Sequence, residues 1–310
     1  MASQQPLKAK SDTPQAAYDK SFRVSENYRC SLPDPQNKSI DTIDGITVPI
    51  SQAGIANFKL PLRFQRTGGD PITLETSVTN TVSVPANQKG INMSRLSRTL
   101  YNYESIAFDP ATLADILKEQ KTSLSAQQAR IKLAFSFPMR QQSLRSNLEG
   151  WQYYPAAYEG ILDHNDDYSQ FIYLDFFYSS ACPCAAELGE HARRTRNIYA
   201  IPHSQRSKAS IKVKVVPSAK VTLEELINYC QSALKTETQV IVRREDEQAF
   251  AELNGAYVKF VEDAARLLYQ ELIRDKRLAD FLVSCVHFES LHSHDAFAVL
   301  TKGVEGGFQV

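Results

Sequence analysis

This sequence has few cysteines, no long apolar run and no excess of charge of either sign. Its 310 residues carry 35 basic and 35 acidic side chains, so net charge gives no reason to expect a surface that grips nucleic-acid phosphates. No stretch approaches the roughly 20 uninterrupted apolar residues of a membrane-spanning helix, and residues 1–11 lack the apolar core of a secretion signal. We therefore expect neither a nucleic-acid partner nor a membrane partner.

Five cysteines are scattered along the chain, an odd number without the spacing of a disulfide framework. A reducing compartment suits such thiols, and we expect a cytoplasmic protein. Several common motifs are also missing: Gly-x-Gly-x-x-Gly after a strand, Gly-x-x-x-x-Gly-Lys and the Gly-x-Ser-x-Gly elbow. Their absence counts against the common nucleotide-binding and hydrolase folds.

Apolar residues make up 43% of the chain and follow two kinds of pattern. Strand-like runs lie within residues 46–86 and at 130–137, 151–161, 170–179, 211–216, 281–288 and 296–300. Helical signals, including cap residues at Asp109 and Thr222, lie at 92–101, 110–121, 222–234 and 258–274. This order predicts an α+β fold with an antiparallel sheet, in two halves of similar plan.

The domain organisation follows from composition. Residues 1–25 are rich in Gln, Ser, Lys and Pro, which predicts a disordered N-terminal arm. We expect a first half at residues 26–145 and a second half at residues 146–310. The second half carries most of the candidate metal-binding and catalytic residues.

Side chains of the types that zinc and manganese select gather in the second half. Cys182 and Cys184 flank a proline at the end of an expected strand, and five of the six histidines fall between His191 and His294. A lone cysteine or histidine is most often a satisfied core residue, but clustering favours a site. Glu289 and His292 are three residues apart, so a continuous strand would place them on opposite faces. Either the strand ends between them or only one is a ligand.

Two zinc chemistries fit the pattern poorly. His287-Phe288-Glu289 matches the His-x-Glu of nucleobase deaminases, but the cysteine motif precedes it, and Glu187 stands where the second cysteine belongs. A structural zinc site is disfavoured because Cys182 and Cys184 are not followed by a second close cysteine pair.

Six short motifs follow one another in the last two thirds of the chain: Lys89-Gly-Ile-Asn-Met-Ser-Arg95, Ser180-Ala-Cys-Pro-Cys184, His203-Ser-Gln-Arg-Ser207, Arg244-Glu-Asp-Glu247, Lys259-Phe-Val-Glu-Asp263 and Phe288-Glu-Ser-Leu-His292. Together, and in this order, they resemble type IB GTP cyclohydrolase, the prokaryotic folate-pathway enzyme. The resemblance implies a tunnelling fold, in which antiparallel sheets and paired helices from several subunits form a barrel. It implies two such units per chain and a homotetramer.

The resemblance also implies a reaction. GTP and water give 7,8-dihydroneopterin triphosphate and formate by opening of the imidazole ring at C8, the first step of tetrahydrofolate biosynthesis. Attack at C8 needs hydroxide near neutral pH, which a divalent metal ion can supply. Zn or Mn is the expected ion, with Fe as a further choice. The implied metal ligands are Cys182, Glu247 and His292, with Glu289 as a fourth ligand or a partner of a ligand.

His203 resembles the proton-transfer histidine of the family, beside Cys182 as the other catalytic residue. The two are 21 positions apart, a longer separation than is usual in the family, and the extra segment carries His191. Either histidine could move the proton. We prefer His203 because the residues at 205–207 of the motif follow it directly.

Substrate binding is likewise implied by the resemblance. Tunnelling-fold enzymes use a buried carboxylate to accept two N–H bonds from the guanine edge, and Glu262 takes that place. The triphosphate requires cations, and the motifs offer Lys89, Arg95 and Arg206. The first motif departs from the family at Asn92, where histidine is often expected.

Two other functions compete. The nitrile reductase of queuosine synthesis shares the tunnelling fold and uses NADPH with a nucleophilic cysteine, but its Glu-(Ser/Leu)-Lys-(Ser/Ala)-x-Lys signature has no counterpart here. A non-catalytic scaffold of the same fold would hold no stoichiometric metal and would have no affinity for guanine.

Overall fold

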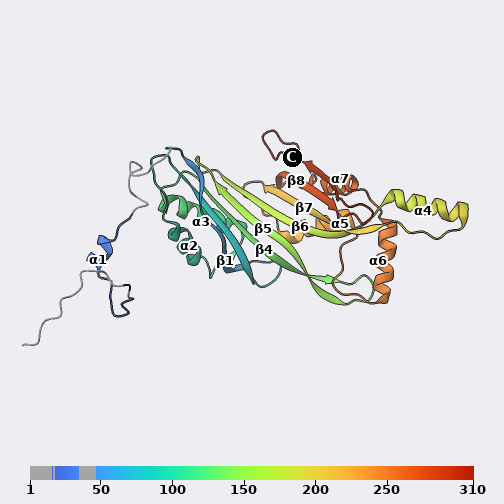
Figure 1. Ribbon diagram of the computed structural model, residues 1–310, viewed down its shortest axis with the longest axis horizontal. Coiled ribbons are helices and arrows are strands. Elements are labelled where there is room, and N and C mark those ends of the chain that lie inside the picture. The colour runs from blue at the N-terminus through green and yellow to red at the C-terminus, as the bar shows by residue number, and fades with distance from the viewer. Residues whose placement is uncertain (1–15, 17, 35–46) are drawn as a thin grey trace, which may run out of the picture.

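A computed structural model describes residue 16, residues 18–34 and residues 47–310. Residues 1–15 and 17 of the expected arm lie outside the described residues. The short helix α1 (Glu26–Ser31) begins after Ser25, whose hydroxyl accepts a hydrogen bond from the backbone of Tyr28. Figure 1 shows α1 away from the body of the molecule, beyond the end where α2 (Met93–Asn102) and α3 (Pro110–Ser123) lie.

Within the described residues, nine strands form one sheet in the order β3-β1-β2-β4-β5-β6-β7-β8-β9. Neighbours pair antiparallel, except that the two-residue β3 (Ala107–Phe108) is parallel to β1. The other strands are β1 (Ile50–Phe64), β2 (Ile72–Val84), β4 (Ala129–Gln142), β5 (Glu149–Leu162), β6 (Tyr168–Ala181), β7 (Ser204–Val215), β8 (Leu278–His287) and β9 (Ala296–Thr301). The expected antiparallel sheet is confirmed, with the short β3 as its one parallel strand among the described residues.

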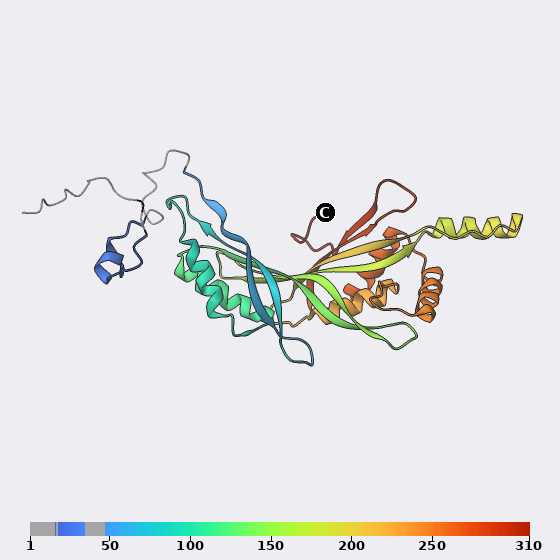
Figure 2. The same cartoon turned by 60° about the horizontal axis from the view of Figure 1, so that its bottom comes forward.

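Two helix groups interrupt the strands. Helices α2 (Met93–Asn102) and α3 (Pro110–Ser123) follow β2, whereas α5 (Leu223–Leu234), α6 (Arg244–Ala256) and α7 (Val261–Leu272) follow β7. Leu133, Tyr158, Ile172 and Val213 are buried and lie in register across β4 to β7, so the apolar face of the sheet is continuous. Helices α3, α5 and α7 cover this face, and Figure 2 shows both groups on the same side of the sheet.

The expected helix caps are present. Asp109 caps α3 with Pro110 as its first residue, and Thr222 forms a capping box with Glu225 at the start of α5. The apolar stripe expected from residue 258 is the buried face of α7. That helix begins only at Val261, so its expected start was wrong by three residues.

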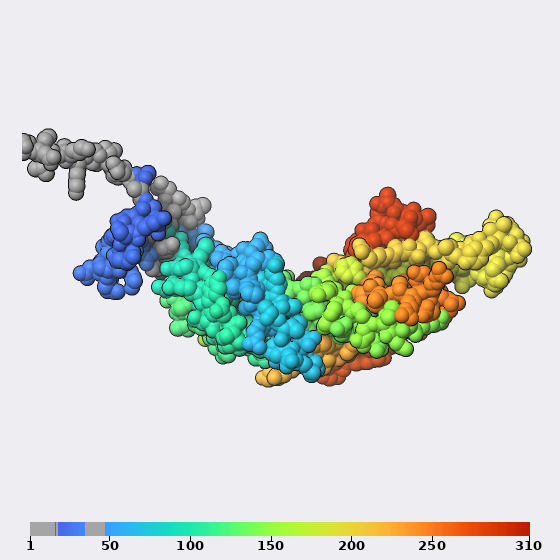
Figure 3. All heavy atoms as spheres, turned by 90° about the horizontal axis from the view of Figure 1, so that it is seen from below, coloured from blue at the N-terminus to red at the C-terminus, as the bar shows by residue number. Residues whose placement is uncertain are grey.

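Besides the short α1, two helices in the described residues were not expected from the sequence. Helix α4 (Pro183–Arg196) buries only Gly189 and Ala192, and α6 buries only Asp246 and Ala249. Neither carries the apolar stripe that reveals an amphipathic helix. Figures 1 and 3 show α4 projecting from the body at the end opposite to α2 and α3.

The boundary expected at residue 145 falls between β4 and β5, and the sheet continues through it without interruption. Each side of the molecule has long antiparallel strands beneath a pair of helices, α2 with α3 and α5 with α7. No helix among the described residues combines the length and the apolar character needed to cross a bilayer.

Candidate active site

Three of the candidate site residues lie at one end of the sheet. Strand β6 ends one residue before Cys182, and β7 begins one residue after His203, with the two strands paired up to this end. Strand β8 pairs with β7 and ends two residues before Glu289. Antiparallel register therefore brings three segments together that are distant in the sequence.

His203 lies at the centre of this meeting point. Its backbone carbonyl accepts a hydrogen bond of 3.1 Å from the backbone N–H of Cys182. Its ring nitrogen Nδ1 lies 3.5 Å from Oε2 of Glu289, and the two side chains are only 18% and 11% exposed. Among the described atoms, that carboxylate oxygen is buried without a hydrogen-bond partner. A buried carboxylate oxygen is costly unless a cation or a donor meets it.

A line of hydrogen bonds runs from His203 into the sheet. The ring nitrogen Nδ1 is 3.1 Å from Oε1 of Gln205, whose Nε2 donates to the hydroxyl of Ser180 at 2.7 Å. That hydroxyl is 2.8 Å from the hydroxyl of Ser207. Sequence reasoning missed Gln205 and the two serines as members of the site, although they lie within two of the motifs.

His287 is a structural residue beside the site. It is 3% exposed, and the hydroxyl of Tyr178 lies 3.0 Å from its Nε2. Burial, with a contribution from the positive charge of Lys259, lowers the pKa of His287 to about 4, so its ring is neutral at pH 7. The ring fills the core, which removes the deaminase-like role considered for His287.

Hydrogen bonds of Lys259 connect the end of β6 to the segment before α7. Its backbone N–H donates to the carbonyl of Ala181 at 3.2 Å, and its ammonium group donates to the carbonyl of Tyr257 and the hydroxyl of Thr236. Burial lowers the pKa of Lys259 to about 8. The loop that carries Lys259 thereby fixes the start of α7, where Glu262 lies.

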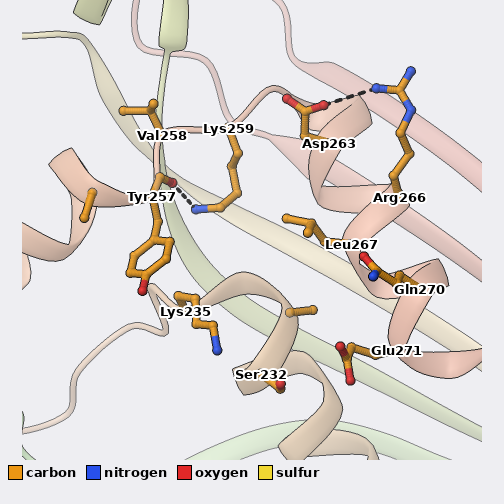
Figure 4. A pocket seen from close by; sticks show the side chains of 12 residues that line it. Ser232, Lys235, Tyr257, Val258, Lys259, Asp263, Arg266, Leu267, Gln270 and Glu271 are labelled. Carbon is orange, nitrogen blue, oxygen red and sulfur yellow. Dashed lines mark hydrogen bonds and ion pairs between the residues drawn. The ribbon is translucent and has the colours of Figure 1, made fainter. Parts of the chain in front are cut away.

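A cavity of about 490 Å³ lies beside Lys259, between α5, α7 and the segment that joins α6 to α7. Figure 4 shows the Lys259 side chain directed toward the carbonyl of Tyr257, with Lys235 below it and the Asp263–Arg266 ion pair above. Glu262 does not line this cavity. It is exposed in the first turn of α7, in contrast to the buried position expected of a guanine anchor.

The remaining expected ligands lie on exposed surfaces. Glu247 is in the first turn of α6, and His292 is in the turn between β8 and β9, where its ring stacks on His294 at 5.0 Å between centroids. Within the described part of the chain, no group of three or more His, Cys, Asp or Glu side chains is placed to hold a metal ion. The four-residue ligand set therefore stays a prediction.

The backbone that carries Glu247 is nevertheless fixed by hydrogen bonds of the residue before it. Its neighbour Asp246 is fully buried and accepts hydrogen bonds from the backbones of Arg145, Ser146 and Arg243, at 2.7, 2.9 and 2.7 Å. Burial opposes ionisation of Asp246, but a hydrogen bond from the hydroxyl of Ser146 and the three backbone bonds prevail and lower the pKa of its carboxyl. These hydrogen bonds connect the start of α6 to the turn between β4 and β5.

Arg206 is the expected cation that lies at this end of the sheet. It is exposed near the start of β7, with its guanidinium 5.6 Å from the ring centre of Phe177. His191 and Cys184 are exposed on α4. Between the two histidines considered for proton transfer, His203 is the one beside Glu289.

Lys89 and Arg95 lie at the other end of the strands. Arg95 donates to the carbonyl of Ser123 at the end of α3, and Lys121 of that helix contacts Asp163 in the turn before β6. A strand of 14 residues such as β6 is about 45 Å long, so neither cation reaches Cys182 of the same chain. Figure 1 shows the corresponding separation of α2 from α4.

Comparison with known proteins agrees with the sequence resemblance. A profile of the family described as type I GTP cyclohydrolase folE2 matches residues 32–298. The chain is 50% identical over 287 residues to a GTP cyclohydrolase FolE2 of Cereibacter sphaeroides, covering 93% of this chain and 80% of that protein. It is 49% identical over 286 residues to the one of Paracoccus denitrificans, covering 92% and 88%.

Among solved structures, the uricase of Arthrobacter globiformis superposes with a TM-score of 0.51 at 9% identity, covering 86% of this chain and 98% of that chain. This likeness concerns the fold alone and confirms the expected tunnelling-fold class. The family assignment rests on the sequence matches, which extend over most of the chain, and the family profile spans the positions of all six motifs. The chain belongs to the type I GTP cyclohydrolase folE2 family.

Proposed function

We propose that this chain hydrolyses GTP at C8 to 7,8-dihydroneopterin triphosphate and formate, the first step of tetrahydrofolate biosynthesis, in the cytoplasm. Family membership supports the reaction. The observation that carries the assignment of the site is the approach of His203 to Glu289 beside Cys182. A thiol, an imidazole and a carboxylate at one strand end are the groups that metal-assisted hydrolysis needs.

The chemistry of the donor groups at this end of the sheet supports a divalent metal ion. The buried Oε2 of Glu289 has no hydrogen-bond partner among the described atoms, and the nearby thiol and imidazole groups are ligands that zinc prefers. We assign Cys182, Glu247 and His292 to hold the ion, with Glu289 completing or supporting the set. Zn or Mn is the proposed ion, with Fe as the alternative. When bound, such an ion supplies a hydroxide near neutral pH.

The chain's own side chains do the remaining work. His203 takes and returns the proton as the ring opens, because it is the histidine next to the buried carboxylate. Glu262 accepts the N–H groups of the guanine edge, which orients C8 toward Cys182. Arg206 binds triphosphate oxygens from the same end of the sheet.

A homotetramer completes the site in this proposal. Lys89 and Arg95 lie at the far end of the strands, so they serve the triphosphate only if another chain supplies them. Glu262, Glu247 and His292 are exposed in the single chain, as residues of a site between subunits would be. Light scattering should give four times the chain mass of 34.8 kDa, whereas a monomer would remove Lys89 and Arg95 from the site.

The reaction is tested by incubating the purified protein with GTP and each added metal. Formate and the pterin fluorescence that develops after oxidation should appear together, in equal amounts, and should depend on Mn or Zn. A folded oligomer that makes no formate with any divalent metal would contradict the proposal. NADPH consumption with a nitrile substrate would then identify the reductase, and absence of both metal and guanine binding would identify the scaffold.

A further inference from the structure

Gln205 is a buried polar side chain near the start of β7. It is the second residue of β7, it is 9% exposed, and it is paired in register with Ser180 of β6. Ser180 and Ser207, which complete its line of hydrogen bonds, are fully buried. A buried side-chain network that is fully bonded holds its members in one arrangement. This network ends on the ring of His203.

The direction of the amide decides which nitrogen of His203 carries hydrogen. An amide offers a donor at one end and an acceptor at the other. Nε2 of Gln205 donates to Ser180, so Oε1 faces Nδ1 of His203 and can only accept. The acceptor oxygen of Gln205 therefore favours hydrogen on Nδ1.

We propose that Gln205 is a positioning residue, which holds hydrogen on Nδ1 of His203 and leaves Nε2 as the atom that exchanges protons with the substrate. The proposal rests on the proton-transfer role proposed for His203. In a neutral imidazole one nitrogen is a donor and the other an acceptor, so fixing Nδ1–H makes Nε2 the acceptor. Gln205 acts through His203 and touches neither substrate nor reacting atoms.

Three variants separate this role from a packing role. Gln205→Leu removes the acceptor and should lower kcat about 10- to 100-fold, the usual cost of losing a partner that orients a catalytic group. Its KM for GTP and its metal content should stay unchanged. Gln205→Glu keeps an acceptor toward both Ser180 and His203 and should recover most of the lost kcat. Gln120→Leu makes the same substitution at a fully buried site in α3 and should leave kcat unchanged.

A double-mutant cycle with His203→Ala gives the decisive result. The amount of formate released is measured over long incubations at high enzyme concentration, so that the residual rate of His203→Ala can be determined. If Gln205 acts through His203, adding Gln205→Leu to His203→Ala should change kcat by less than about twofold. A further loss as large as that in the wild-type background would overturn the proposal. So would a Gln205→Leu enzyme with normal kcat, or a Gln205→Glu enzyme as slow as Gln205→Leu.

The proposed function fails separately from this inference. If the wild-type chain releases no formate from GTP, the reaction itself is wrong. If the wild-type chain and Gln205→Leu release formate at the same rate, the reaction stands and only the positioning role is wrong.

Discussion

The strands β1 to β5 with α2 and α3, and the strands β6 to β9 with α5 and α7, bury polar side chains differently. In the first region Asn80 and Gln120 are fully buried, and within the described residues their amide atoms have no hydrogen-bond partner. In the second region Gln205, Lys259 and His287 are buried and each is hydrogen-bonded. Among the described residues, similar architecture thus carries two side-chain amides without any partner on one side, and on the other a connected network beside the unpartnered Oε2 of Glu289.

This difference indicates where the fold has been adapted for chemistry. Buried polar groups that satisfy one another fix a single arrangement, which a reacting site requires. The network of the second region ends at Cys182, His203 and Glu289, whereas the buried amides of the first region lead to no cluster of ligands. Both regions share long antiparallel strands covered by a pair of helices. The fold alone therefore does not determine the function, which depends on the side chains of the second region.

The largest expected effect is at Cys182. If the second region alone holds the metal, Cys182→Ala should lose the ion and lower kcat by at least about 1,000-fold, or about 4 kcal/mol of activation free energy. Metal content by atomic emission and formate release measure both effects. Cys184→Ala, two residues along and exposed, is the matched control and should keep both. Full turnover with retained metal in Cys182→Ala would remove Cys182 from the site.

The pH dependence of stability tests whether the ammonium group of Lys259, in the second region, is buried in the native state. Burial lowers its native pKa to about 8 from an ordinary 10.5, so between these values the unfolded chain holds more protons. Stability should therefore rise from pH 8 to pH 10.5, by about 3 kcal/mol at about 1.4 kcal/mol per unit. Urea unfolding of the wild-type chain and of Lys259→Met measures the difference. Identical pH dependence in both proteins would show that Lys259 is not desolvated in the native state.

Substrate binding should depend on Glu262 without involving the metal. Glu262→Ala should raise KM for GTP by about 30-fold, because hydrogen bonds to a charged group are worth about 2 kcal/mol. Metal content should be unchanged. Glu271→Ala, on the same helix but paired with Arg274, is the control and should bind GTP normally. An unaltered KM in Glu262→Ala would place the guanine anchor elsewhere.

The smallest effect is expected in the first region. Gln120→Leu replaces a buried amide that has no hydrogen-bond partner among the described residues with an apolar side chain of similar size. The free energy of unfolding should increase by about 1 kcal/mol, the lower range for removing an unsatisfied buried group. Chemical denaturation at fixed protein concentration measures it. A loss of stability would show that Gln120 has a partner, such as a water molecule, and would weaken the contrast between the regions.

Sequence patterns predicted the parts of the fold that have strong local signals. Helices α3 and α5 were predicted because Asp109 and Thr222 cap them, and the long strands because their apolar residues alternate. Helix α4 was missed because Gly189 and Ala192 alone are buried, which leaves no stripe to detect. Local signals cannot reveal a helix that is exposed on nearly every side.

The site was predicted as a set of residues but not as an arrangement. Motifs singled out His203 and Glu289, yet their contact depends on the register of β7 with β8, two strands whose paired residues are 63 to 80 positions apart in the chain. Gln205 gained its role only from pairing with Ser180 across β6 and β7. Hydrogen bonds between strands are set by tertiary structure, so no spacing within one segment predicts them.

The most direct test of the central claim uses GTP labelled with ¹³C at C8. After incubation with the metal-reconstituted protein, the account predicts that the label appears in formate and is absent from the pterin product, with one formate per GTP consumed. Label that remains in a nucleotide or pterin while GTP is consumed would contradict hydrolysis at C8 and the site described for it.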